Sequence, residues 1–142
     1  TILAAAEDPR YTVSAMELER GGVSYTCDTL RQLHRRWHRF YDLYFIIGAD
    51  SAEQLPTWHN IREAMHYATF AAAARPGVAP PKGKVSEDLA RQGLRNLVWV
   101  DTPELDLSST EIRERIRKGE PVDTMVPKAV AEYIEQRDLY RQ

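Results

Sequence analysis

The sequence predicts an α/β fold built on a parallel sheet, and three short apolar runs carry that prediction. Residues 43–47, 70–74 and 97–100 contain no charged side chain, and each run ends at glycine or at a charged residue. Short uninterrupted runs of this kind predict strands, and the run at 43–47 is typical of a strand buried on both faces, which usually pairs in parallel. Segments with helical spacing separate the runs, and strands that alternate with helices form βαβ units.

The chain fits one domain. Its 142 residues are 43% hydrophobic and 28% charged, which is ordinary for a globular protein. A chain of this length buries enough surface to fold without disulfides or a structural metal. We therefore expect residues 1–142 to form a single α/β domain.

Apolar spacing and end signals predict the helices. Between residues 26 and 38, Leu30, Leu33 and Trp37 recur at intervals of three and four and share one face. Residues 11–19 alternate imperfectly, as a strand with a bulge does. Further helices are expected at residues 1–8, 58–67, 86–92, 108–118 and 127–137.

The helix at 108–118 has the clearest end signals. Ser108 and Glu111 have capping-box spacing, and Gly119 stands just past the end. Free backbone N–H groups at a helix start bind anions, and Ser109, Thr110 and Arg113 add polar donors there. The alternative is an ordinary capped helix with arginines at its surface.

Ligands of open parallel sheets bind beyond the carboxyl ends of the strands. Gly48 follows the first apolar run and would admit a ligand close to the backbone, and Asp50 could accept hydrogen bonds from a ribose. The alternative for Asp50 is a helix cap. Arg75 follows the second run and could meet a phosphate, or it could be a solvated loop residue.

Two further positions are candidates for ligand contacts. Trp58 precedes a predicted helix and could stack on a planar ring, although burial in the core is the commoner role of tryptophan. Thr26 begins another predicted helix, where its backbone N–H could hold a carboxylate. Simple capping by Thr26 or Asp28 is the alternative.

Composition excludes several classes of function. The net charge of −2 does not indicate a nucleic-acid partner, and no apolar run is long enough to span a membrane. Cys27 is the only cysteine, so a reducing, cytoplasmic setting is expected. The four histidines show no metal-ligand spacing, so no metal site is expected, and no catalytic nucleophile stands out.

Six segments together resemble the bacterial nicotinate-nucleotide adenylyltransferase family. Two of them are Tyr-Phe-Ile-Ile-Gly-Ala-Asp-Ser at 44–51 and Leu-Ser-Ser-Thr-Glu-Ile-Arg at 107–113. The others lie at residues 19–30, 55–58 and 75–77 and in the tail at 126–127 and 138–140. The segments occur in the family's order and cover nearly the whole chain.

The resemblance implies a Rossmann-like nucleotidyltransferase fold. It implies adenylyl transfer from ATP to nicotinate mononucleotide, with Mg²⁺ entering together with ATP and held by no dedicated protein site. Residues that match the family's ATP site are Gly48, Asp50, Arg75, Ser109, Thr110 and Arg113. For the mononucleotide, the resemblance implies stacking on Trp58 and capture of the carboxylate by the backbone N–H groups of Thr26 and His59.

The chain departs from the family pattern at one important place. It contains no His-x-Gly-His segment, whose histidines stabilise the transferred phosphates in the family, and it lacks the strand before that segment. We therefore expect a chain that is incomplete at its N-terminus, holds no catalytic residue and is inactive alone. Exposed strand edges pair with neighbours, so a homo-oligomer or strand-exchanged assembly is expected.

Two alternatives remain open at this point. A non-catalytic nucleotide-binding or interaction module of the same fold would also lack the histidines. A nucleotidyltransferase of the pantetheine-phosphate type is less compatible with Trp58 and with the Ser-Tyr-Thr segment at 24–26.

Overall fold

The protein is described by a computed structural model that covers residues 1–74, 82–103 and 107–141. The chain divides into two compact units. We call Met16–Glu104 the sheet unit, and Thr1–Ala15 with Leu105–Gln142 the helical unit.

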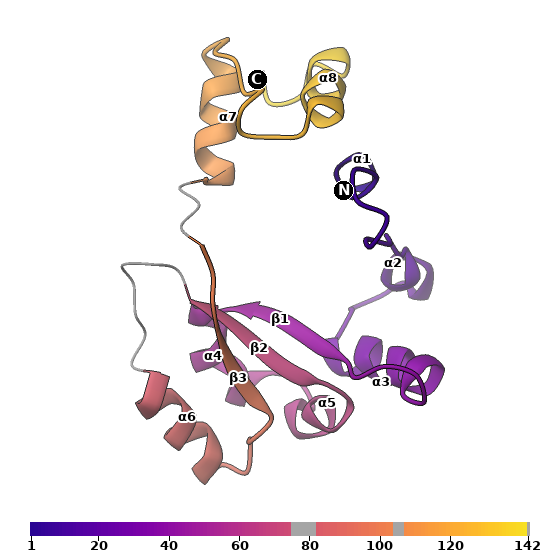
Figure 1. The fold of residues 1–142 in the computed structure, drawn as a ribbon, viewed down its shortest axis with the longest axis vertical. Coiled ribbons are helices and arrows are strands. Elements are labelled where there is room, and N and C mark those ends of the chain that lie inside the picture. The colour runs from indigo at the N-terminus through magenta and orange to yellow at the C-terminus, as the bar shows by residue number, and fades with distance from the viewer. Residues whose placement is uncertain (75–81, 104–106, 142) are drawn as a thin grey trace. The chain divides into compact units, whose positions relative to one another are not determined.

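The sheet unit contains a parallel sheet of three strands, as the apolar runs predicted. The strands are β1 (Tyr44–Gly48), β2 (Thr69–Ala74) and β3 (Leu97–Asp101), in the order β1-β2-β3 (Figure 1). Gly48 pairs with Ala73, and Ala74 pairs with Asp101. The carboxyl ends of all three strands therefore reach the same edge of the sheet.

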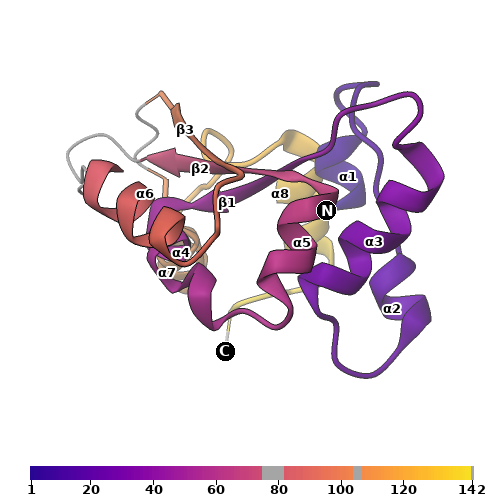
Figure 2. The same ribbon diagram turned by 90° about the horizontal axis from the view of Figure 1, so that it is seen from below.

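Helices cover one face of this sheet. The helices of the sheet unit are α2 (Met16–Arg20), α3 (Thr26–Trp37), α4 (Ala49–Gln54), the 3₁₀ turn η1 (Leu55–Thr57), α5 (Ile61–Tyr67) and α6 (Lys82–Arg91). Figure 2 shows α4, α5 and α6 on a common side of the strands. Phe70, Leu55 and Cys27 are the largest fully buried side chains of the core between these layers.

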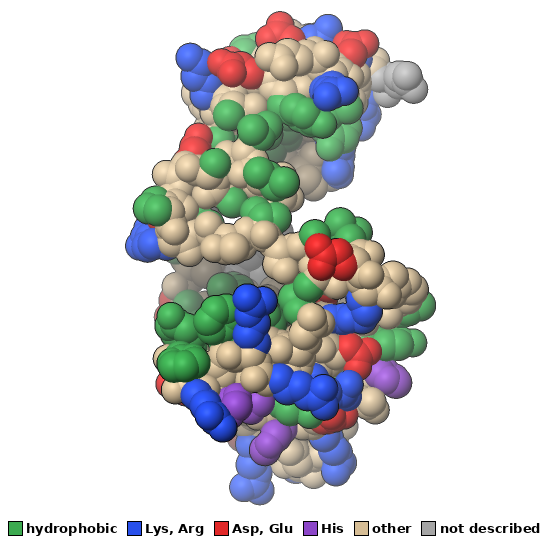
Figure 3. Space-filling view, turned by 90° about the vertical axis from the view of Figure 1, so that its right-hand side faces the viewer, with side chains coloured by type: hydrophobic (Ala, Val, Ile, Leu, Met, Phe, Trp, Pro, Cys, Tyr) green, Lys and Arg blue, Asp and Glu red, His purple; other side chains and the backbone are tan. Residues whose placement is uncertain are grey.

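The expectation that the strands are buried on both faces was wrong for β1. Ile47 is 7% exposed on the helix-covered face, whereas Tyr44 and Ile46 are 64% and 75% exposed on the other face. Ala71 of the central strand is only 6% exposed, because strands flank it on both sides. The helices of the sheet unit pack against one face, and large apolar side chains remain at the surface (green in Figure 3).

The prediction of a strand at residues 11–19 was also wrong. Residues 11–15 form no strand, and Met16–Arg20 is the helix α2. Its glutamates lie in the first turn and its arginine in the last, which suits the helix dipole. Thr29 then ties α2 to α3, since its hydroxyl donates to Glu17 at 2.6 Å and accepts from Arg20 at 3.2 Å.

Other predicted helices differ mainly at their boundaries. The helix predicted at 58–67 begins at Ile61, because residues 55–57 form η1 and residues 58–60 form a turn. The helix α6 begins at Lys82, four residues before its predicted start. The helix α4 follows β1 without a loop and was not predicted.

The helical unit has a small core of its own. Its helices are α1 (Ile2–Ala5), α7 (Ser109–Arg117) and α8 (Lys128–Gln136), so the opening helix is shorter than predicted. Ile116, Val122 and Ile134 form the buried cluster, and α1 contacts α8. As predicted, α8 starts directly after Pro127, and Gly119 follows α7 with a φ of 72°. Among the described helices, none has the length and apolar character needed to cross a membrane.

Candidate functional site

A small cavity in the sheet unit brings three predicted site residues together. Its volume is about 130 Å³, and it lies between the start of α3 and the turn before α5. It is lined by Ser24, Tyr25, Thr26, Trp58, His59, Ile61 and Ala64. Ligand pockets usually measure about 300–1,000 Å³, so this cavity admits one end of a nucleotide and not the whole molecule.

The wall formed by α3 offers unused backbone donors. Tyr25 is the N-cap of α3, with φ −92° and ψ 137°, and no side chain caps the helix. Capping by Thr26 or Asp28 is therefore not observed; the carboxylate of Asp28 instead accepts from Arg31 at 2.8 Å. Within the described part of the chain, the backbone N–H groups of Thr26 and His59 have no acceptor. Such groups at a helix start suit a carboxylate.

Trp58 lies half in the core and half at the cavity. Its indole meets Phe45 and Phe70 edge-on, with ring centroids 6.3 and 6.2 Å apart. The same residue lines the cavity and is partly exposed. Both expected roles, core packing and a platform beside a ligand, are thus compatible with its position.

A ring stack at the cavity was missed by sequence reasoning. The rings of Tyr25 and His59 stack with centroids 4.0 Å apart and planes at 28°. Both residues line the cavity, and both are exposed, Tyr25 by 40%. Thirty-four positions separate them in the chain, so no local pattern could have paired them. The position of Tyr25 directly before Thr26 was the only available signal.

The carboxyl edge of the sheet holds a second group of candidates. Gly48 ends β1, and a Cβ placed on it would meet no atom within 4 Å, so the backbone there is accessible. Asp50 is exposed in the first turn of α4 and does not cap the helix, whose N-cap is Gly48. Arg75 lies outside the described residues.

Asp101 at the same edge was overlooked, although it follows an apolar run just as Gly48 does. It ends β3, and its carboxylate is paired with Lys82 at 2.6 Å. The hydrogen bond from this ammonium lowers the pKa of Asp101 below its ordinary value. Its side chain remains 89% exposed.

The start of α7 belongs to the helical unit. The hydroxyl of Ser108 accepts from the backbone N–H of Glu111 at 3.1 Å, which confirms the predicted cap. Ser109 and Thr110 are exposed in the first turn, and Arg113 Nη2 lies 3.4 Å from Ser109 Oγ. The structure therefore groups Ser109, Thr110 and Arg113 at one helix end, in a different unit from the cavity residues.

Comparison with known proteins identifies the family. The family described as cytidylyltransferase-like matches residues 1–115. A probable nicotinate-nucleotide adenylyltransferase of Thermus thermophilus is 43% identical over 99% of this chain and 70% of its own length. Proteins of the same name from Roseiflexus castenholzii and Streptomyces coelicolor are each 40% identical, over 98% and 99% of this chain and 68% and 71% of their own lengths. The chain belongs to the nicotinate-nucleotide adenylyltransferase family.

Solved structures agree with this membership at the level of the fold. The Plasmodium falciparum nicotinic acid mononucleotide adenylyltransferase complexed with APC superposes with a TM-score of 0.62 at 18% identity. The match covers 85% of this chain and 60% of that one. This adenylyltransferase chain therefore has a Rossmann-like nucleotidyltransferase fold, as its family resemblance implied.

Proposed function

We propose that the protein transfers an adenylyl group from ATP to nicotinate mononucleotide, forming deamido-NAD and pyrophosphate. One observation carries the proposal: Thr26 and His59, whose backbone N–H groups have no acceptor among the described residues, line the same cavity as Trp58. Two donors and an aromatic ring are what a planar pyridine with a carboxylate needs. Membership of the adenylyltransferase family supports the same substrate.

The chemistry is an in-line displacement at phosphorus. A phosphate oxygen of nicotinate mononucleotide attacks the α-phosphorus of ATP, the new P–O bond forms, and the bond to the leaving pyrophosphate breaks. Catalysis of such transfers depends on positioning and on stabilising the developing negative charge. The carboxylate end of the mononucleotide would be held by the cavity.

The remaining predicted residues would hold ATP. Gly48 leaves room for the adenosine, and Asp50 is free to accept from the ribose hydroxyls. Ser109, Thr110 and Arg113 offer hydroxyls, a guanidinium and a positive helix end to the phosphates. Arg75, which the sequence places after the second apolar run, is proposed as a further ATP contact.

Mg²⁺ is proposed to arrive bound to ATP. In residues 1–74, 82–103 and 107–141, no three His, Cys, Asp or Glu side chains converge as a metal site would require. The ion would be held by the phosphates of ATP and would neutralise their charge. Because the substrates are nucleotides of central metabolism, we place the protein in the cytoplasm.

A proline at the first position of α3 gives a direct test. Thr26→Pro removes the N–H donor, and proline is well tolerated at this helical position. The extended Tyr25, at φ −92° and ψ 137°, already suits a residue before proline. Thr26→Val is the matched control, because it removes the hydroxyl and keeps the N–H.

Calorimetric titration should show that the wild-type chain prefers nicotinate mononucleotide to nicotinamide mononucleotide. Thr26→Pro should weaken binding of the nicotinate form about tenfold, the usual effect of losing a hydrogen bond to a charged acceptor. Thr26→Val should bind like the wild type. Equal affinity of the wild type for both nucleotides would contradict the proposed function.

A further inference from the structure

A charged network joins α3 to α5 just outside the cavity. The Nε and Nη2 atoms of Arg31 lie 3.0 and 2.9 Å from Oε1 of Glu63 on α5. Its Nη1 lies 2.8 Å from Oδ1 of Asp28, one turn earlier on α3. The hydroxyl of Tyr67 donates to the same Glu63 oxygen at 2.8 Å. Arg31 is therefore the residue through which the two helices are connected at this end.

The network involves sequence neighbours of residues that line the cavity. Arg31 Nη2 is 3.6 Å from Sγ of Cys27, which is fully buried and follows Thr26 in the chain. Glu63 precedes Ala64, and Ala64 lines the cavity. Each anchor of the network is thus next to a residue that forms the cavity, one on α3 and one on α5.

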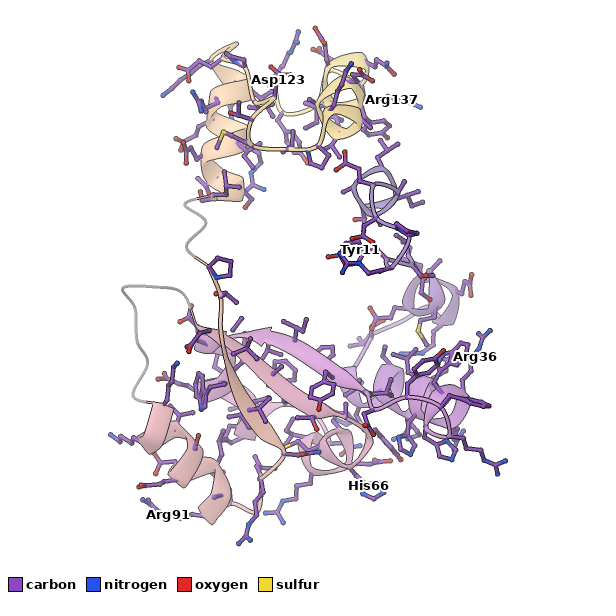
Figure 4. All side chains as sticks on the ribbon, in the orientation of Figure 1. Tyr11, Arg36, His66, Arg91, Asp123 and Arg137 are labelled. Carbon is purple, nitrogen blue, oxygen red and sulfur yellow. The ribbon has the colours of Figure 1, made fainter. Side chains whose placement is uncertain are left out.

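A second connection holds the same helices further from the cavity. Nδ1 of His34 lies 3.2 Å from the backbone oxygen of Tyr67, at the end of α5. Figure 4 shows the two helices side by side, with Arg36 on α3 and His66 on α5. Among the described residues, these two sets of polar contacts join the helices in addition to the apolar core that they share, and the set at Arg31 is the nearer in sequence to the cavity residues.

We propose that Arg31 is a positioning residue that sets selectivity for a ring carboxylate over a ring carboxamide. By holding α3 against α5, it sets the position of Thr26, at the start of α3, relative to His59, in the turn two residues before α5. A carboxylate can accept from both donors, but a carboxamide presents its own NH₂ group to one of them. Charge-assisted hydrogen bonds depend on close and well-aligned donors, so a loosened helix pair loses selectivity. This inference rests on the proposed function.

The test compares both mononucleotides on variants of the whole chain. Arg31→Met keeps the length of the side chain and removes the guanidinium. We expect about tenfold weaker binding of nicotinate mononucleotide, the usual cost of a poorly made hydrogen bond to a charged group. Binding of nicotinamide mononucleotide should change less than about twofold, so the ratio of the two dissociation constants should fall. Arg31→Lys should give a ratio between those of Arg31→Met and the wild type, because lysine keeps the positive charge but lacks the several N–H donors of the guanidinium.

His34→Ala is the matched control, because it breaks the connection far from the cavity. It should lower the melting temperature and leave the ratio of dissociation constants unchanged. If Arg31→Met does not fold, Glu63→Gln removes the partner charge in a nearly isosteric way and should lower the same ratio.

Two outcomes separate this inference from the proposed function. A wild-type preference for the nicotinate form that survives Arg31→Met or Glu63→Gln would overturn the role of Arg31 alone. A wild type without any preference would overturn the carboxylate site itself, and the role of Arg31 with it.

Discussion

Trp58 packs against the core residues Phe45 and Phe70 and also lines the cavity. Because its indole packs against Phe45 and Phe70, Trp58→Ala should lower the free energy of unfolding by about 2–4 kcal/mol. It should also weaken binding of nicotinate mononucleotide. Trp58→Phe keeps an aromatic ring and should retain most of the stability. Urea denaturation measures the first effect, and an Ala variant as stable as the wild type would contradict the packing described above.

Cys27 should be unreactive in the folded protein. Burial is the main cause that raises the pKa of its thiol, and the nearby charge of Glu63 adds to the effect. Because the thiolate is the reactive form, alkylation by iodoacetamide at pH 7.5 should be at least about tenfold slower in buffer than in urea. Mass spectrometry of the timed reaction measures both rates. Similar rates in the two conditions would show that α3 opens readily.

The α3–α5 pair should lose stability in acid through Glu63. Hydrogen bonds from Tyr67 and Arg31 lower the pKa of Glu63 in the folded protein. The stabilising effect is therefore complete above the unfolded value of about 4.3, and it is lost as the pH falls through the lower folded value.

The corresponding variant is Glu63→Gln. It should melt at a lower temperature than the wild type at pH 7, and the gap should narrow as the pH drops below about 4. Thermal melts monitored by circular dichroism at both pH values measure the gap. A gap that is constant with pH would mean that the charge of Glu63 contributes nothing.

At the start of α7, two neighbouring serines have different expected roles: Ser108 caps the helix, and Ser109 is proposed to contact phosphate. Ser108 accepts from the N–H of Glu111, so Ser108→Ala should cost about 1 kcal/mol of stability. Ser109 is exposed and caps nothing in the described structure, so Ser109→Ala should leave stability nearly unchanged and weaken ATP binding. Urea denaturation and ATP titration of both variants test the division. If Ser109→Ala lost stability and Ser108→Ala lost ATP binding, the assignment of the cap to Ser108 and of the phosphate contact to Ser109 would be wrong.

At the scale of elements, sequence reasoning succeeded where the signal is local. The strands β1, β2 and β3 follow from uninterrupted apolar runs, and the cap of α7 follows from the spacing of Ser108 and Glu111. It failed at residues 11–19, because alternation cannot tell whether a neighbouring strand is available. The Tyr25–His59 stack depends on the packing of α3 beside α5, which no local window contains.

At the scale of the whole molecule, the sequence could not predict which sheet face would be covered. The sequence pattern of an apolar run does not differ between a strand covered on one face and a strand covered on both. Tyr44 and Ile46 were therefore predicted to be buried. In the structure the helices of the sheet unit cover the face of Ile47 and Phe70. Covering a face depends on contacts between distant elements, and these are not encoded in the periodicity of a single strand.

The exposed sheet face leads to a prediction about association. Ile46 and Tyr44 of β1 are exposed on the same face of the sheet as Val98 and Val100 of β3, which are 41% and 42% exposed, and β2 lies between the two strands. Contiguous apolar surface and the free edges of a three-stranded sheet favour pairing with another chain. We therefore expect the 142-residue chain to self-associate, with a sedimentation coefficient that rises with concentration.

Ile46→Lys should weaken this association, because it places a charge on the most exposed of these four apolar side chains. It should leave the melting temperature of the dilute protein nearly unchanged, since a side chain that is 75% exposed contributes little to the core. Leu18→Lys is the matched control, because Leu18 is 86% exposed on α2 and lies away from the strands. If the Ile46→Lys variant still associates and the Leu18→Lys variant does not, the contact between chains does not involve the exposed sheet face. A wild-type chain that stays monomeric at every concentration would contradict the prediction of self-association.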